Sequence, residues 1–77
     1  MKKYTKKEFK NLVAIGAAED ITNYSVERMS EFLKSHDLER IGLSYGTYGM
    51  NAGLLKDIET GKLYAITARN SALFMAF

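Results

Sequence analysis

His36 is the residue of this chain best suited to acid–base or nucleophilic catalysis, because it is the only histidine and the chain has no cysteine. Acyl-transfer chemistry needs a hydroxyl within hydrogen-bond reach of a base that an acid orients. Ser35, Ser44 and Ser71 offer hydroxyls, but Asp37 would point about 100° away from His36 around a helix. A histidine at the end of a helix also suits the negative pole of the helix dipole. We therefore interpret His36 as a helix-end residue and predict that the protein is not an enzyme.

The acidic residues do not suggest a site either. Glu19 and Asp20 fall at an expected helix end, and Asp57 and Glu59 flank an expected turn. Acid–base chemistry needs paired carboxylates held near a substrate, and a metal site without cysteine needs a carboxylate-rich cluster. Solvated surface positions explain all four residues. The sequence therefore predicts no metal, no cofactor and no small-molecule substrate.

Glycine is concentrated in one short stretch, where Gly42, Gly46, Gly49 and Gly53 lie within twelve residues. Glycine inside a strand costs about 0.5–1 kcal/mol relative to alanine, so the cluster implies a turn or a close approach. A phosphate loop places its glycines between a strand and a helix, whereas here strands are expected on both sides. We expect a turn over residues 49–53 and a close approach earlier in the stretch, and no nucleotide site.

Two helices are expected in the N-terminal half. Thr5 and Glu8 have the spacing of a capping box, and Tyr4 and Phe9 occupy the positions of a hydrophobic staple. The first helix should run from there to about residue 20, with Gly16 as a point of close contact. Ser25 should cap a second helix that ends near residue 36. The short linker between the helices predicts an antiparallel αα-hairpin.

Strands are expected in the C-terminal half. Residues 40–48 alternate with period two, residues 54–58 and 62–69 read as further strands, and Gly61 sits at a tight turn. Residues 72–77 should form a docked strand or short helix. The sequence therefore predicts a single α+β domain over 1–77, with two N-terminal helices packed on one face of a small antiparallel three- or four-stranded β-meander.

The expected sheet has apolar residues on both faces but helices for only one of them. The even-numbered side of residues 40–48, with Gly42, Ser44 and Gly46, should form a smooth strip against solvent or a partner. We therefore expect a non-enzymatic protein-interaction module that forms a homodimer or binds another protein, such as an accessory or inhibitor protein of a phage or mobile element. Its partner-binding anchors would be Tyr45, Tyr48, Met50, Phe74 and Phe77.

A small nucleic-acid-binding protein is the alternative, because residues 1–10 carry a net charge of +4 and the rest of the chain −2. Tyr45 and Tyr48, which lie on the expected sheet near basic residues, would stack on unpaired bases. The residues for this role would be Lys2, Lys3, Lys6, Lys7, Lys10, Arg40 and Arg69. Two observations oppose it: a lysine-rich start can be a fraying, solvated tail, and residues 37–77 carry equal numbers of acidic and basic residues.

The N-terminus has the positive start of a signal peptide, but Glu8, Lys10 and Asn11 interrupt the apolar region that should follow. No segment approaches the roughly 20 apolar residues of a membrane span. We therefore expect a cytoplasmic protein with no membrane partner.

Overall fold

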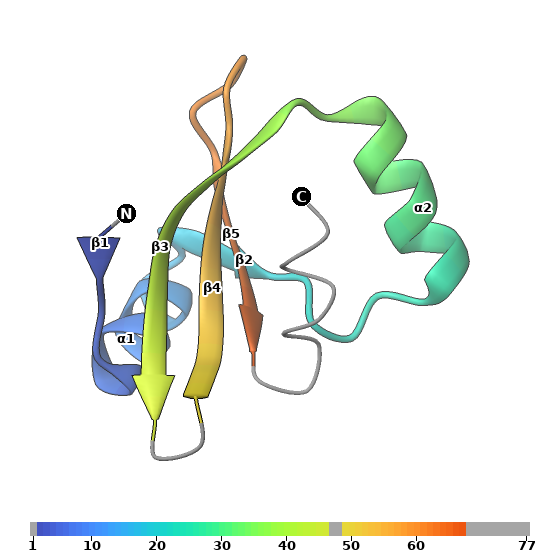
Figure 1. Cartoon of the computed structure of the whole chain (residues 1–77). Coiled ribbons are helices and arrows are strands. Elements are labelled where there is room, and N and C mark those ends of the chain that lie inside the picture. Colours follow the sequence, from blue (N-terminus) through green and yellow to red (C-terminus); the bar gives the residue numbers. More distant parts are fainter. Residues whose placement is uncertain (1, 47–48, 68–77) are drawn as a thin grey trace.

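The computed structural model describes residues 2–46 and 49–67, and Figure 1 shows how its elements are arranged. The helices are α1 (Lys6–Ala14) and α2 (Val26–Ser35). The strands are β1 (Lys2–Lys3), β2 (Ala18–Asp20), β3 (Leu38–Gly46), β4 (Gly49–Asp57) and β5 (Leu63–Thr67). A short strand thus precedes each helix, and three consecutive strands follow them.

The described strands form one five-stranded mixed sheet in the order β1-β3-β4-β5-β2. The three central strands pair antiparallel, as their short connections predicted. At the edges, β1 pairs parallel with β3, and β2 pairs parallel with β5. The chain therefore crosses from one edge of the sheet to the other through α1 before it builds the centre.

The two helices pack on opposite faces of this sheet, so the predicted αα-hairpin on one face of an antiparallel meander is wrong. Phe9 of α1 packs with Leu54 and Ala65, whereas Phe32 of α2 packs with Leu55 and Tyr64. Neighbouring residues along a strand point to opposite faces, which places the two helices on opposite sides. Figure 1 shows α1 beside β1 and β3, with α2 well separated from it.

Gly16 explains why the first helix is shorter than predicted. The helix ends at Ala14 with Ile15 as its C-cap, and Gly16 adopts a φ of +77° with no atom near the position of a Cβ. It is therefore a helix stop, and our expectation of a close contact there is wrong. Ala18, Glu19 and Asp20 then extend as β2 along β5, where Ile21 donates a backbone hydrogen bond to Ala65.

The local signals for the helix starts and the hairpin turn are confirmed. The Thr5 amide donates to Glu8 Oε1 (3.0 Å), and the Glu8 amide donates to the Thr5 hydroxyl (3.1 Å). Ser25 caps α2 by accepting a hydrogen bond from the Arg28 amide. Gly61 has a φ of +77° in the turn between β4 and β5. The turn predicted over residues 49–53 is wrong, because these residues belong to β4, and Gly46 pairs with Gly49.

Two residues of the small-residue strip on β3 are buried inside the protein. Gly42 and Ser44 are both buried, and the ring of Tyr4 from the same chain lies against Gly42. Register shifts near Ile41 and between Ser44 and Tyr45 also break the strict alternation expected along this strand. The expected close approach is therefore real, but the chain's own N-terminal segment makes it.

In the part of the chain that the structure describes, no helix combines the length and apolar character needed to cross a membrane.

Candidate functional site

The lysines of residues 2–10 lie on a strand and a helix rather than on the solvated tail considered from the sequence. Lys2 and Lys3 form β1, which pairs with Gly42 and Leu43 of β3. The remaining lysines lie on α1, whose start is fixed by the capping box. All five are exposed: Lys2, Lys3, Lys6, Lys7 and Lys10. We call this set the basic surface.

Tyr4 holds the basic surface in place. Its amide donates to the Leu43 carbonyl (2.8 Å), and its ring meets Phe9 edge-on at 5.5 Å between centroids. A Cβ on Gly42 would overlap this ring, with the Tyr4 Cδ2 atom only 2.8 Å away. The staple predicted from Tyr4 and Phe9 is thus confirmed, and it joins β1, α1 and β3 into one unit.

Glu8 is the single acidic residue between Lys2 and Lys10, and the capping box holds it. Hydrogen bonds from the Thr5 amide and then the Thr5 hydroxyl lower the pKa of Glu8, with a smaller contribution from the charge of Lys2. Its carboxylate stays charged at neutral pH, so the segment keeps the net +4 read from the sequence. The basic surface therefore carries an excess of positive charge on a strand and a helix whose backbones are held by strand pairing and by the capping box.

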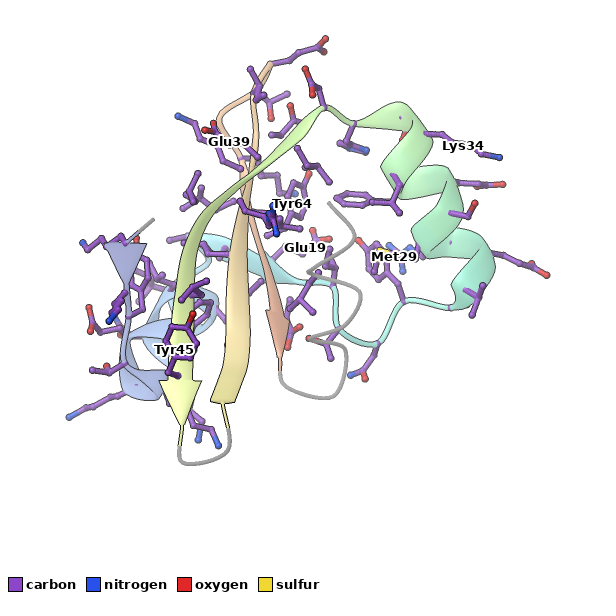
Figure 2. The ribbon with its side chains drawn as sticks, in the orientation of Figure 1. Glu19, Met29, Lys34, Glu39, Tyr45 and Tyr64 are labelled. Atoms are coloured by element: carbon purple, nitrogen blue, oxygen red, sulfur yellow. The ribbon has the colours of Figure 1, made fainter. Side chains whose placement is uncertain are left out.

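Tyr45 extends the basic surface with an aromatic ring. Tyr45 is 58% exposed, and the Lys3 ammonium lies 5.9 Å from the centroid of its ring. Figure 2 shows Tyr45 near the end of β3, far from Lys34 on α2. An exposed ring beside a cation is the combination used to bind unpaired bases. The parallel pairing of β1 with β3 brings these two residues together.

The remaining predicted site residues are distributed differently. Arg40 lies half-buried in β3, and it already has an interaction partner within the protein. Met50 lies in β4, but its side chain is not described. Tyr48, Phe74, Phe77 and Arg69 lie outside the described residues, as does the predicted terminal element over 72–77. Of the expected partner-binding anchors, the structure therefore places only the side chain of Tyr45.

A second polar cluster, which the sequence did not reveal, centres on Glu19 of β2. The Tyr24 hydroxyl donates to Glu19 Oε2 (2.5 Å), and Lys62 Nζ donates to Glu19 Oε1 (3.1 Å). The Arg28 guanidinium stacks 3.8 Å from the centroid of the Tyr24 ring. No sequence signal could identify this cluster, because Glu19 was assigned to a helix and Lys62 is distant in the chain.

Hydrogen bonds in this cluster shift the pKa values of its three members, Glu19, Tyr24 and Lys62. The Tyr24 hydroxyl, and after it Lys62, lower the pKa of Glu19. The same contacts with Glu19 raise the pKa of Tyr24 and the pKa of Lys62. Glu19 of β2 is thus paired with Lys62, next to β5, and with Tyr24, just before α2. Its carboxylate is engaged by both partners.

A shallow hollow of about 300 Å³ lies between α2 and the sheet beside this cluster. It is lined by Glu19, Tyr24, Arg28, Glu31, Phe32, Ser35, His36 and Tyr64. Its aromatic rings pack against one another: Phe32 meets Tyr64 at 4.8 Å and stacks on His36 at 4.2 Å. These rings are part of the core beneath α2, which is why the hollow is shallow.

Ser35, His36 and Asp57 meet beside this hollow, but they do not form a catalytic triad. His36 Nδ1 lies 2.9 Å from the Phe32 carbonyl, which can only accept, so Nδ1 carries the proton. Ser35 Oγ lies 2.9 Å from this same nitrogen and donates to the Glu31 carbonyl. The nitrogen next to the serine therefore has no lone pair with which to accept the hydroxyl proton.

Asp57 has a structural role that explains its burial. It is 4% exposed, and its Oδ1 accepts hydrogen bonds from the amides of Glu59 (2.9 Å) and Thr60 (3.2 Å). Its Oδ2 lies 4.0 Å from His36 Nε2. The carboxylate thus shapes the β4–β5 turn and faces the end of α2, where His36 is the C-cap as predicted.

No group of three or more histidine, aspartate or glutamate residues with metal-binding geometry exists within residues 2–46 and 49–67. Comparisons of the chain with family models, curated proteins and solved structures found no match. The basic surface and Tyr45 are therefore the features from which a function can be inferred.

Proposed function

We propose that this protein is a small, non-enzymatic nucleic-acid-binding protein whose basic surface contacts the phosphate backbone. One observation carries the proposal: five exposed lysines lie on β1 and α1, which are held by strand pairing and by the capping box. A lysine that is already positioned loses less conformational freedom when it meets a phosphate than one on a fraying tail. The proposal also places the protein in the cytoplasm.

Counterion release is the expected source of affinity. Each lysine that neutralises a phosphate releases condensed cations, so the logarithm of the binding constant falls linearly with the logarithm of salt concentration. Five such contacts on a single strand correspond to a slope of about −3.5. The neutral balance of residues 37–77 is compatible with this, because the contact is confined to the other part of the chain.

The proposal is tested with paired lysine variants and a fluorescein-labelled oligonucleotide, measured by anisotropy. The variant Lys6→Gln/Lys10→Gln removes two charges from the basic surface. The matched control Lys34→Gln/Lys56→Gln removes two charges from exposed positions on α2 and β4. We expect the first variant to weaken binding and to reduce the salt slope by about 1.4, and the control to keep the wild-type slope. Equal effects of both variants, or no binding by the wild-type protein, would overturn the proposal.

The protein-interaction module remains a second candidate, although for a different reason. The sequence predicted one sheet face without a helix, whereas a helix packs on each face. A different surface favours it: Val13 and Ile15 are 36% and 66% exposed at the end of α1. Val13 also lines a hollow of about 400 Å³ beside the edge strand β2. An exposed apolar side chain beside a hollow is typical of protein-contact surfaces.

Sedimentation equilibrium tests this second candidate. If the protein self-associates through this surface, Ile15→Ser should weaken association, whereas Val26→Ser should leave it unchanged. Val26 is a suitable control because it is 88% exposed and lies on α2. A wild-type protein that stays monomeric from micromolar to millimolar concentration would contradict the homodimer.

A further inference from the structure

We infer that the basic surface selects single-stranded over double-stranded nucleic acid, with Tyr45 as the ring on which an unpaired base stacks. This inference rests on the proposed function and adds the class of nucleic acid and the residue that chooses it. It begins from the position of Tyr45, whose ring is exposed within 5.9 Å of the Lys3 ammonium.

The chain's four described tyrosines are used differently, and only Tyr45 is largely exposed. Tyr4 packs on Gly42 and Phe9, Tyr24 is hydrogen-bonded to Glu19, and Tyr64 is 5% exposed. Tyr45, in contrast, has 58% of its surface exposed. Burial of an aromatic side chain of this size normally stabilises the folded protein. The exposure of Tyr45 beside a lysine is therefore consistent with a contact surface.

Stacking on Tyr45 requires a base whose flat face is uncovered. In a duplex, neighbouring base pairs cover both faces of every internal base, and a side chain reaches only the base edges in the grooves. In a single strand, a base can rotate out and lie on an aromatic ring while its phosphates remain near cations. Tyr45 and Lys3 offer these two contacts side by side.

The lysines of α1 do not by themselves choose between a duplex and a single strand. Helices that read the major groove use arginine, lysine, asparagine or glutamine at base edges. Lys6, Lys7, Lys10 and Asn11 are exposed on α1, and Glu8 is held in the capping box. Because the lysines can meet the phosphates of either form, the preference for a single strand depends on base stacking at Tyr45.

The experiment compares a fluorescein-labelled 20-nucleotide DNA as a single strand and as its blunt duplex, with single-stranded RNA of the same sequence as a third probe. The proteins are wild type, Tyr45→Leu and Tyr45→Phe. The Tyr45 side chain is largely exposed, so both substitutions should fold, which circular dichroism would check. Loss of one stacked base corresponds to a weakening of about 5- to 150-fold.

We expect the single strands to bind more tightly than the duplex, Tyr45→Leu to weaken single-strand binding by that factor, and Tyr45→Phe to retain it. Duplex binding should be the same for all three proteins. If single strand and duplex bind equally and Tyr45→Leu changes neither, the inference is overturned, whereas the lysine dependence and the proposed function stand. If the wild-type protein binds no probe at 50 mM salt, the proposed function and this inference fail together.

Discussion

The ring of Tyr4 lies against the backbone of Gly42, and this contact joins the N-terminal strand to the centre of the sheet. Tyr4 also donates its amide to Leu43 and packs edge-on against Phe9. Lys2 and Lys3 precede this ring and the other three lysines follow it. The position of the basic surface therefore depends on an uncharged glycine of β3, which is the strand partner of Lys2.

Replacing Gly42 with alanine should destabilise the protein by about 1–3 kcal/mol. The added methyl group would overlap the Tyr4 ring, and overpacking a tightly filled site costs this amount. Urea denaturation at pH 7 measures the change. In the background of Tyr4→Ala the same substitution should cost much less, because the atoms that collide are gone. An equal cost in both backgrounds would show that the ring is not the cause.

Replacing Glu19 with glutamine should cost no more than about 1 kcal/mol at pH 7. Glu19 accepts from both Tyr24 and Lys62, but its side chain is 42% exposed, so solvent screens the ion pair. Tyr24→Phe should lose a similar or smaller amount, since it removes only the hydroxyl. The control is Glu39→Gln, an exposed carboxylate of β3 labelled in Figure 2, which should change stability less.

The stabilising effect of Glu19 should also depend on pH. Its folded-state pKa lies below the ordinary value of 4.5, so its contribution is present above that value and is lost as the pH falls through the folded-state pKa. The difference in unfolding free energy between wild type and Glu19→Gln should therefore shrink at acidic pH. A difference that stays constant from pH 7 to pH 3 would contradict the hydrogen-bonded carboxylate.

Replacing Ser44 with alanine should be neutral or stabilise the protein by up to about 1 kcal/mol. Its hydroxyl is buried and has no hydrogen-bond partner among the described residues, and such a group costs free energy to bury. Thr22→Val is the contrasting variant, because the buried Thr22 hydroxyl donates to Asp20. We expect it to lose about 1 kcal/mol or more. Thermal unfolding compares the two, and a clear loss for Ser44→Ala would reveal a partner for that hydroxyl.

Residues with strong local signals were predicted correctly from the sequence. The capping box of Thr5 and Glu8, the Ser25 cap and the turn at Gly61 each depend on interactions within a few residues. The three long strands were predicted, because alternation extends over enough positions to be seen. The first five residues of β4 were wrongly assigned to a turn. The antiparallel pairing of the three strands followed from the short connections.

The edge strands could not be predicted, and this made the predicted fold wrong. β1 has two residues and β2 has three, which is too short for any periodicity. Gly16 was interpreted as a contact within a longer helix, so the residues of β2 were assigned to that helix. Because β2 was not predicted, nothing in the sequence indicated that the chain crosses from one edge of the sheet to the other. Both helices were therefore placed on one face.

The candidate site was predicted in part. The five lysines were named from the sequence for a nucleic-acid contact. Tyr45 was named both as a partner-binding anchor and as a ring for base stacking. The proximity of Tyr45 to the lysines depends on the parallel pairing of β1 with β3, which no local pattern indicates. The same limit applies to Glu19 and Lys62, which meet only because β2 lies beside β5.

A ¹⁵N-resolved NMR titration of the wild-type protein with an unlabelled single-stranded 20-nucleotide DNA at low salt would test directly whether the basic surface contacts nucleic acid. Amide shifts should concentrate in residues 2–10 and around Tyr45, and should be absent from α2. Shifts that concentrate on α2 or β2 instead, or no shifts at millimolar DNA, would contradict a nucleic-acid contact through the basic surface.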